Sequence, residues 1–240
     1  MTGGIFLSQK RTAKLDPRLE KTASFVRPDA IFADIGCDHG YLAIELIHRG
    51  AVRGYACDIS AGPLQSAQRN IEQAGLSSQI QTVLTDGLQG LEQYGLTDIT
   101  IAGMGGEVIA GILQKAPFLK NPSIRLILQP QSREFILRRF LAENGFALLR
   151  EEAVRSGRYV YTVMVAEYDG GIHQLSPLES YCGLLIHCHT PEACEKLQRT
   201  AGFLKETADG LFHRGKPEEA QELLDISQQI AELSTPSSST

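Results

Sequence analysis

The sequence has no tryptophan, and only 7% of its 240 residues are aromatic. Its five cysteines are odd in number and unevenly placed, which does not fit a disulfide framework. No apolar run approaches the ~20 residues that a membrane helix needs. Residues 1–11 also lack the apolar core of a secretory signal. These absences lead us to expect a cytoplasmic protein in a reducing compartment, with no membrane contact.

A metal site is not expected either. The chain has no Cys-x2-Cys pair, and Cys182, Cys188 and Cys194 follow one another at steps of six residues. Six residues turn a helix by ~240°, so these thiols point in different directions.

Charge is unevenly distributed along the chain. The net charge is −5, but residues 1–168 carry +1 and residues 169–240 carry −6. The first 27 residues hold six Lys and Arg against two acidic residues. This basic segment is either an electrostatic footprint for a polyanion or a solvated helix face, and the sequence leaves both open. The apolar fraction of 42% is sufficient for a folded core.

Short apolar runs alternate with amphipathic stretches through the first two thirds of the chain. Asp16-Pro17 is a favourable helix start, and this first helix is expected to reach about Phe25. Strands are expected at 30–35, 54–57, 80–84, 99–102 and 125–128, and helices at 41–49, 61–74, 88–94, 107–116 and 133–144. A hairpin of 146–153 and 159–166 follows. Five βα units closed by a hairpin are typical of the seven-stranded, Rossmann-like methyltransferase sheet.

Beyond the glycines at 170 and 171 the pattern becomes helical. Apolar residues recur at spacings of three and four from Leu178 to Cys188, from Leu197 to Leu211 and from Leu223 to Leu233. We expect a helical hairpin packed as an antiparallel coiled coil. The predicted domains are 1–168 and 172–233, with a disordered tail at 234–240.

The loop 34–41 follows the first βα strand and carries the strongest local signal. Gly36 permits a sharp turn and Gly40 permits close approach of a ligand. A dinucleotide site would need G-x-G-x-x-G, which is absent. Carboxylates stand here instead, at Asp34 and Asp38, with Asp58 after the second strand. They suit a cation and a ribose diol, which S-adenosylmethionine offers, although a turn that merely uses glycine is the alternative.

Two later strand ends extend this pattern. An acidic residue at the end of the second strand normally accepts hydrogen bonds from ribose hydroxyls, and Asp58 stands at this place. The alternative is that Asp58 or Ser60 caps the next helix. Asp86 and Gly87 are placed to meet an adenine amino group. After the fourth strand, residues 103–106 contain three glycines, which predicts a close backbone approach or a plain turn. No D/N-P-P-Y/F motif is present, so a mechanism of that type on an exocyclic amine is disfavoured.

The fifth strand ends in two amides, and a basic helix follows it. Gln129 and Gln131 are candidates for contacts to a base edge. Arg133 and Arg138 are candidates for phosphate contacts, or for surface charges balanced by Glu134 and Glu143.

The strings A-D-I-G-C-D-H-G-Y-L (33–42), I-A-G-M-G-G (101–106) and L-I-L-Q-P (126–130) together resemble the bacterial tRNA adenine-N1-methyltransferases that modify position 22. The resemblance implies a class I methyltransferase domain, a C-terminal coiled-coil domain, S-adenosylmethionine as cofactor and tRNA as substrate. The family pattern often has Asn where this chain has Gln131, which bears on substrate choice.

Carried over residue by residue, the resemblance implies a cofactor site and an acceptor site. By the resemblance, the cofactor site comprises Asp34, Gly36, Asp38, His39, Gly40, Asp58, Asp86 and Gly87. We add their neighbours Cys37, Tyr41, Ile59, Ala102 and Gly103. The acceptor base is expected to face Gly103, Met104, Gln129 and Gln131, with no general base assigned. The expected RNA contacts are Lys10, Arg11, Lys14, Arg18, Arg133 and Arg138.

The expected chemistry is direct methyl transfer to adenine N1, which is unprotonated at neutral pH. Because N1 lies on the Watson–Crick edge, the nucleotide must leave its stack. Three alternatives stay open: a small-molecule methyltransferase, an NAD-linked oxidoreductase, and a non-catalytic RNA- or partner-binding protein on the same scaffold. No oligomer is required by any of them.

Overall fold

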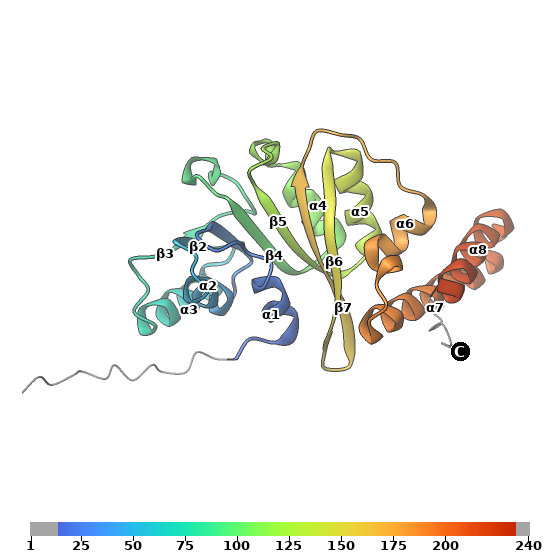
Figure 1. Ribbon diagram of the computed structural model, residues 1–240, viewed down its shortest axis with the longest axis horizontal. Helices are drawn as coiled ribbons and strands as arrows, with labels where there is room; N and C mark the ends of the chain where they lie inside the picture. The colour runs from blue at the N-terminus through green and yellow to red at the C-terminus, as the bar shows by residue number, and fades with distance from the viewer. Residues whose placement is uncertain (1–13, 234–240) are drawn as a thin grey trace, which may run out of the picture.

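The computed structural model describes residues 14–233. Its centre is a seven-stranded sheet in the order β3-β2-β1-β4-β5-β7-β6, in which β7 alone runs antiparallel to its neighbours (Figure 1). The strands are β1 (Ile31–Ile35), β2 (Arg53–Asp58), β3 (Ile80–Leu84), β4 (Asp98–Gly105), β5 (Arg125–Ser132), β6 (Phe146–Ser156) and β7 (Tyr159–Tyr168). This confirms the predicted Rossmann-like methyltransferase sheet.

Helices cover both faces of the sheet. They are α1 (Pro17–Ala23), α2 (Tyr41–His48), α3 (Ala61–Gln73), α4 (Gly106–Gln114), α5 (Glu134–Glu143), α6 (Pro177–Cys182), α7 (Pro191–His213) and α8 (Pro217–Leu233), with 3-10 turns η1 (Glu92–Tyr94), η2 (Pro117–Leu119) and η3 (Gly183–His187). Alternate residues of β1 enter two cores. Phe32 packs with α2 and α3, whereas Ala33 and Ile35 pack with α4 and α5. The predicted cap is present, since the Asp16 carboxylate accepts from the first backbone N–H groups of α1.

Two predicted helices differ from the structure. The helix expected at 88–94 is only the short turn η1, because Gly90 and Gly95 on either side adopt positive φ. The helix expected at 178–188 ends after Cys182, because Gly183 adopts a φ of 54°. A helix cannot continue through that backbone conformation.

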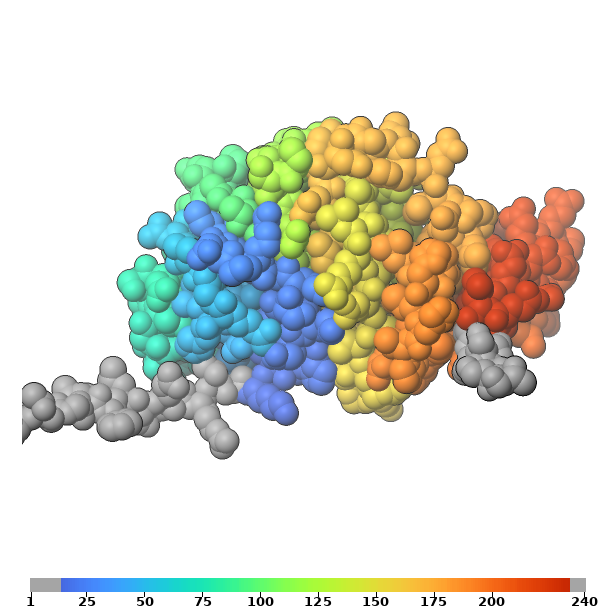
Figure 2. Space-filling model, in the orientation of Figure 1, coloured from blue at the N-terminus to red at the C-terminus, as the bar shows by residue number. Residues whose placement is uncertain are grey.

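The last two helices form a helical hairpin at the β6 end of the molecule (Figures 1 and 2). Their facing residues are buried, including Leu197 and Leu204 of α7 and Ile226 and Ile230 of α8. The supercoil of a coiled coil and the domain limits at 168 and 172 stay predictions. The predicted tail 234–240 lies outside the described residues.

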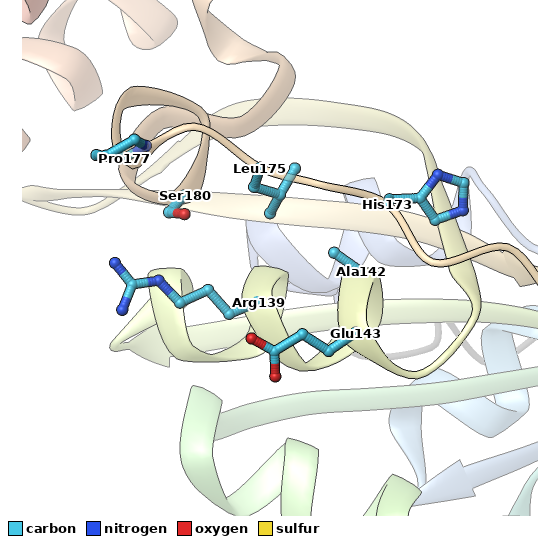
Figure 3. A pocket seen from close by; sticks show the side chains of 7 residues that line it. All are labelled: Arg139, Ala142, Glu143, His173, Leu175, Pro177 and Ser180. Carbon is cyan, nitrogen blue, oxygen red and sulfur yellow. The ribbon is translucent and has the colours of Figure 1, made fainter.

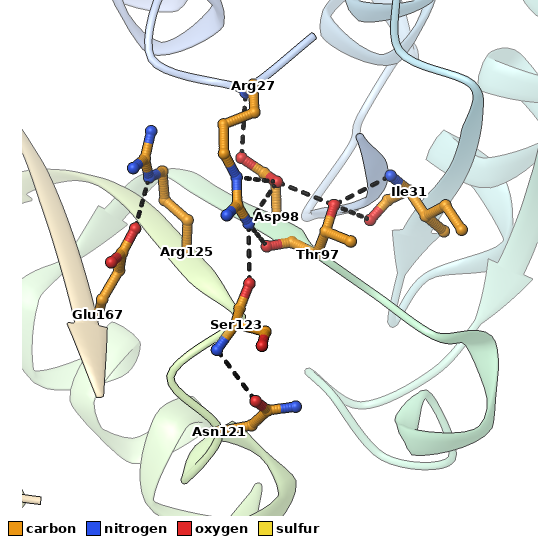
Figure 4. A network of polar contacts seen from close by, with 8 residues as sticks. All are labelled: Arg27, Ile31, Thr97, Asp98, Asn121, Ser123, Arg125 and Glu167. Atoms are coloured by element: carbon orange, nitrogen blue, oxygen red, sulfur yellow. Dashed lines mark hydrogen bonds and ion pairs between the residues drawn. The ribbon is translucent and has the colours of Figure 1, made fainter. Parts of the chain in front are cut away.

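A polar network fastens the amino-terminal edge of the sheet (Figure 4). Asp98, fully buried at the start of β4, accepts from the backbone N and the Nε of Arg27 at 3.1 and 3.0 Å. The Arg27 guanidinium also donates to the carbonyls of Thr97 and Ser123. The network therefore ties the segment after α1 to the starts of β4 and β5, at the edge opposite the glycine loops.

A second buried ion pair joins the sheet to the C-terminal helices. Arg138 of α5 and Glu151 of β6 are both fully buried, and their side chains meet at 2.9 Å. Arg138 also donates to the carbonyls of Ser180 and Tyr181, and Glu151 accepts from the Leu184 backbone at 2.6 Å. The predicted RNA contact at Arg138 is therefore wrong, because no part of its guanidinium is free to meet a phosphate.

Candidate functional site

The carboxyl ends of β1 and β4 border a cavity of about 250 Å³. It is lined by Arg18, Leu19, Asp34, Gly36, Cys37, Asp38, His39, Tyr41, Leu42, Ala102, Gly103 and Gln131. The structure thus brings the predicted loop after β1 together with the predicted glycine segment after β4. Open α/β sheets bind ligands at this edge, beside the point where the strand order reverses.

The loop after β1 has a backbone that few side chains tolerate. Gly36, Asp38 and Gly40 all have positive φ, of 76°, 49° and 72°. A Cβ on Gly40 would lie 3.1 Å from the Ala67 side chain, and one on Gly36 would overlap the methyl group of Met104. The two glycines are therefore required by the turn and by its neighbours. The side chain of Met104 packs against the glycine loop.

Asp34 is a buried carboxylate with one oxygen left unpaired. Its Oδ1 accepts from the Thr100 hydroxyl at 2.9 Å, whereas Oδ2 has no hydrogen-bond partner. Burial raises the pKa of Asp34 to about 7; the Thr100 hydrogen bond opposes this shift and the charge of Asp58 adds to it. An unpaired buried oxygen that borders a cavity is a site for a cationic hydrogen-bond donor.

The cysteines near this carboxylate are not nucleophiles. Burial raises the pKa of the Cys37 and Cys57 thiols, and the nearby Asp34 and Asp58 carboxylates raise it further. The reactive form of a cysteine is the thiolate, so both thiols stay inert at neutral pH.

The ends of β2 and β3 carry the other predicted cofactor residues, outside the lining of the cavity. Asp58 Oδ1 accepts from the Ser60 backbone at 2.8 Å, so it shapes the turn into α3, and Ser60 itself makes no side-chain cap. Asp86 is exposed, with Lys115 Nζ at 3.8 Å. Ile59 and Leu84 are 67% and 60% exposed, which gives an apolar surface at these two strand ends. Sequence reasoning missed Leu84, although its place before Thr85 and Asp86 was a usable signal.

These features fit S-adenosylmethionine chemically. The unpaired oxygen of Asp34 suits an ammonium group, and the free lone pairs of Asp58 suit ribose hydroxyls. The exposed apolar side chains of Ile59 and Leu84 suit the face of an adenine ring. Glycines at 36 and 40 leave room for a ligand next to the backbone.

Gln129 holds the glycine segment at the end of β4 in place. Gly103 has a φ of 82°, and the pairing of β4 with β5 is irregular around Met104. Gln129 is fully buried, and its Oε1 accepts from the Gly103 backbone at 3.1 Å and from Arg18 Nη1 at 2.9 Å. The expected contact of Gln129 with a base edge is therefore wrong, because its oxygen fixes the backbone instead. Gln131 is exposed and lines the cavity.

The predicted RNA contacts have different surroundings. Arg18 lines the cavity and therefore belongs to the site itself. Its Nε lies 2.8 Å from Asp16 Oδ2. Lys14 is exposed. Arg133 is exposed and paired with Glu107 at 2.9 Å, so its charge is balanced by a different glutamate from the expected Glu134 and Glu143. Lys10 and Arg11 lie outside the described residues.

A second cavity, of about 270 Å³, lies between α5 and the segment before α6 (Figure 3). It is lined by Arg139, Ala142, Glu143, His173, Leu175, Pro177 and Ser180. Its polar side chains are spread along the groove in Figure 3 rather than gathered at one point. It therefore lacks the convergent polar groups of a typical ligand site.

Residues 14–233 contain neither a cluster of metal ligands nor a helix that could span a membrane. No group of three or more His, Cys, Asp or Glu side chains in this range is placed to hold a metal ion. No helix in the same range is long and apolar enough to cross a membrane.

Comparison with known proteins identifies the class. A family model described as a methyltransferase domain matches residues 15–164. Together with the sheet and the glycine loops, this match defines the chain as a class I methyltransferase. The match argues against the alternative of an NAD-linked oxidoreductase.

Individual relatives identify the family. The chain is 33% identical over 201 residues to the tRNA (adenine(22)-N(1))-methyltransferase of Bacillus subtilis (strain 168), covering 83% of this chain and 82% of that protein. The crystal structure of the B. subtilis m1A22 tRNA methyltransferase TrmK superposes with a TM-score of 0.81 at 28% identity, covering 91% of this chain and 99% of that one. The chain belongs to the family of the tRNA (adenine(22)-N(1))-methyltransferases.

A further relative was solved with a ligand. A Streptococcus pneumoniae protein, provisionally named a tRNA (m1A22) methyltransferase, was solved in complex with S-adenosyl-L-methionine. It superposes with a TM-score of 0.78 at 34% identity, covering 89% of this chain and 98% of that one.

Proposed function

We propose that this protein transfers the methyl group of S-adenosylmethionine to N1 of the adenine at position 22 of tRNA. The observation that carries the proposal is the pairing of two features across one cavity. One is a buried carboxylate with an unpaired oxygen, and the other is a glycine segment with little side chain. Membership of the tRNA (adenine(22)-N(1))-methyltransferase family supports the same substrate.

The cofactor binds along the ends of β1, β2 and β3. Bound S-adenosylmethionine supplies an electrophilic methyl group on a sulfonium centre. Asp34 accepts from its ammonium group and Asp58 from its ribose, while Asp86 and the backbone at Gly87 meet the adenine amino group. Ala102 and the loop residues Cys37, Asp38, His39 and Tyr41 border the same site. These residues bind and orient, so their contribution is positioning and electrostatics.

The acceptor adenine lies over Gly103 and Met104. Its N1 carries a free lone pair at neutral pH, so no side chain has to remove a proton before transfer. Gly103 has no side chain, so the Arg18 guanidinium and the Gln131 amide lie directly beside its backbone, 3.3 and 3.6 Å from where a Cβ would be. Gln129 holds that backbone in place, and Gln131 is the exposed amide able to reach a base edge. Arg18 borders the acceptor on the Gly103 side of the cavity, with its charge compensated by Asp16.

The tRNA phosphates meet the basic N-terminal segment, to which Lys14 belongs along with Lys10 and Arg11. Binding by phosphate contacts predicts an affinity that falls as salt concentration rises. A tRNA substrate also makes the cytoplasm the place where the protein works.

The test is transfer of labelled methyl groups from S-adenosylmethionine to tRNA transcripts. Two transcripts that differ only at position 22, adenosine in one and guanosine in the other, form the matched pair. The proposal expects label in the first and only background in the second. Equal labelling of the two, or label only in small metabolites of a cell extract, would contradict it.

A further inference from the structure

The hairpin of β6 and β7 projects beyond the sheet on the side of the active cavity. β7 pairs with β5 only from Met164 onward, so residues 159–163 extend past that pairing. The turn 156–159 lies at the carboxyl edge of β6, which runs parallel to β1 and β4. α1 packs against both strands of the hairpin, and the two lie side by side in Figure 2.

A row of ring and guanidinium groups runs along this hairpin toward the cavity. The Arg158 guanidinium lies 4.9 Å from the centre of the Tyr159 ring. The ring centres of Tyr159 and Tyr161 are 6.1 Å apart, since alternate strand residues share a face. The Arg18 guanidinium lies 5.8 Å from the centre of the Tyr161 ring, and Arg18 lines the cavity. We call these four residues the stacking track.

The outer end of the track is exposed and carries an uncompensated charge. Tyr159 is 45% exposed. Within residues 14–233 no carboxylate pairs with Arg158, whereas its neighbour Arg155 is paired with Glu195. A free guanidinium beside an exposed aromatic ring is complementary to an anion that carries a flat ring. Unpaired nucleotides have both properties, because they offer a base to stack and a phosphate to pair.

We infer that the stacking track binds the unpaired nucleotides that flank the acceptor adenine of the tRNA. This inference rests on the proposed function. The inner end, Arg18, touches the cavity that receives the acceptor, so the track and the acceptor site are continuous. The charge and the rings favour RNA over a protein partner at this surface.

The stacking track offsets the free-energy cost of moving the acceptor nucleotide out of its stack. Adenine N1 becomes accessible only when its nucleotide leaves the stack, which costs the stacking free energy of that step. Rings that receive the neighbouring bases offset this cost. The track therefore acts on tRNA binding and leaves cofactor binding alone.

The test measures steady-state methylation of a tRNA transcript by Tyr159→Leu and Arg158→Gln. Tyr159→Leu should raise the KM for tRNA by at least about fivefold, since stacking of one base on an aromatic ring contributes at least that much. Arg158→Gln should raise the KM as well, because it removes a cationic partner of phosphate. The kcat at saturating tRNA and the Kd for S-adenosylmethionine should change by less than about twofold. Tyr159→Phe, which keeps the ring, should rescue most of the loss. Phe203→Leu is the control, because Phe203 is 54% exposed on α7 and lies outside the track.

The outcomes separate this inference from the proposed function. If the wild-type protein methylates no tRNA, the proposed function fails. If the wild type is active and both track variants keep its KM, the inference is overturned. It is overturned as well if Tyr159→Phe is as impaired as Tyr159→Leu, or if the losses come with weaker cofactor binding or a lower Tm.

A second readout locates the contact directly. A tRNA transcript with 4-thiouridine at position 21 or 23 should cross-link under light to the peptide that contains Tyr159 and Tyr161. Mass spectrometry identifies that peptide. Cross-links confined to α7 or α8 would contradict the inference.

Discussion

The buried carboxylate of Asp34 is unfavourable in the free protein, and it is the group that we propose binds the ammonium of the cofactor. Its carboxylate is buried at the end of β1, with Oδ1 bound to Thr100 and Oδ2 unpaired. Burial disfavours the charged form, and this raises the pKa of Asp34 from 3.8 to about 7. A cation at Oδ2 would reverse that shift. The residue therefore couples the binding of a cationic ligand to the release of a proton.

This coupling predicts a pH-dependent affinity for S-adenosylmethionine. Below pH 7 Asp34 is protonated in the free protein and must lose its proton on binding. The Kd should therefore rise as pH falls below 7, approaching tenfold per unit. Isothermal titration at pH 5.5, 6.5 and 8 measures it. Asp34→Asn should bind weakly at all three values. His39→Gln, which removes the histidine from the same cavity, should keep the wild-type dependence; loss of the dependence in that variant would point to the wrong residue.

The raised pKa of Asp34 also predicts that the stability of the free protein falls as pH rises, whereas its affinity for S-adenosylmethionine increases. Its folded-state pKa is raised, so its contribution to stability is fully present below pH 4 and is lost as pH rises to 7. The full loss is roughly 4 kcal/mol. Without ligand, Asp34→Asn should therefore be more stable than the wild type at pH 8. Urea denaturation of the two proteins checks this, and a destabilised variant would contradict the account.

The sequence was sufficient to place an acidic residue, Asp34, at the end of β1, but not to predict its raised pKa. That shift needs Thr100 and the burial supplied by β4, which pairs beside β1 from 66 residues further along the chain. Gln129 and Arg138 failed for a related reason. Each is a polar residue whose partners, Gly103 and Glu151, come from another strand. A sequence pattern cannot show whether such a side chain faces a ligand or a neighbouring strand.

At the scale of elements, we propose that the end of β4 positions the acceptor. Gly103 combines a φ of 82° with a close neighbour, since a Cβ there would lie 3.3 Å from Arg18 Nη1. Gly103→Ala should strain the backbone and press against Arg18 and Gln131, which border the proposed acceptor position. We expect kcat/KM to fall by at least about 100-fold while the Kd for S-adenosylmethionine stays within about threefold. An active Gly103→Ala enzyme would show that the acceptor lies elsewhere.

The junction of α5, β6 and α6 gives a second prediction at this scale. Removing Arg138 leaves Glu151 buried without its charge partner, which should lower the free energy of unfolding by about 3–5 kcal/mol. The neighbouring Arg139 is exposed and lies over the rings of Phe135 and Tyr181, so Arg139→Ala should cost less than about 1 kcal/mol. Chemical denaturation of the two alanine variants checks the difference. Equal losses would contradict a structural role for Arg138.

The order of the strands along the chain followed from the alternation of apolar runs with amphipathic stretches, because central strands such as β1, β2 and β5 are buried on both faces. Helix ends were harder to place where a glycine decides. Gly183 stops α6, and a Cβ at this position would overlap Glu151 and Arg138. This requirement comes from the buried ion pair, so the periodic pattern from Leu178 to Cys188 gave no sign of it.

For the whole molecule, net charge differs between the region that forms the sheet and the C-terminal helical region. Residues 1–168 carry a net charge of +1 with a basic first segment, and residues 169–240 carry −6. We propose that phosphate contacts concentrate on the N-terminal segment and the β6–β7 hairpin, and that the acidic α7–α8 hairpin has only limited contact with phosphate. We also propose that residues 1–168 and residues 172–233 form two separate domains.

The most direct test of the central claim is mass spectrometry of tRNA nucleosides. A tRNA transcript is incubated with the protein and isotopically labelled S-adenosylmethionine, then digested to nucleosides. The account predicts one labelled product, N1-methyladenosine, that maps to position 22. Label on another base, or on the exocyclic amine of adenine, would contradict it.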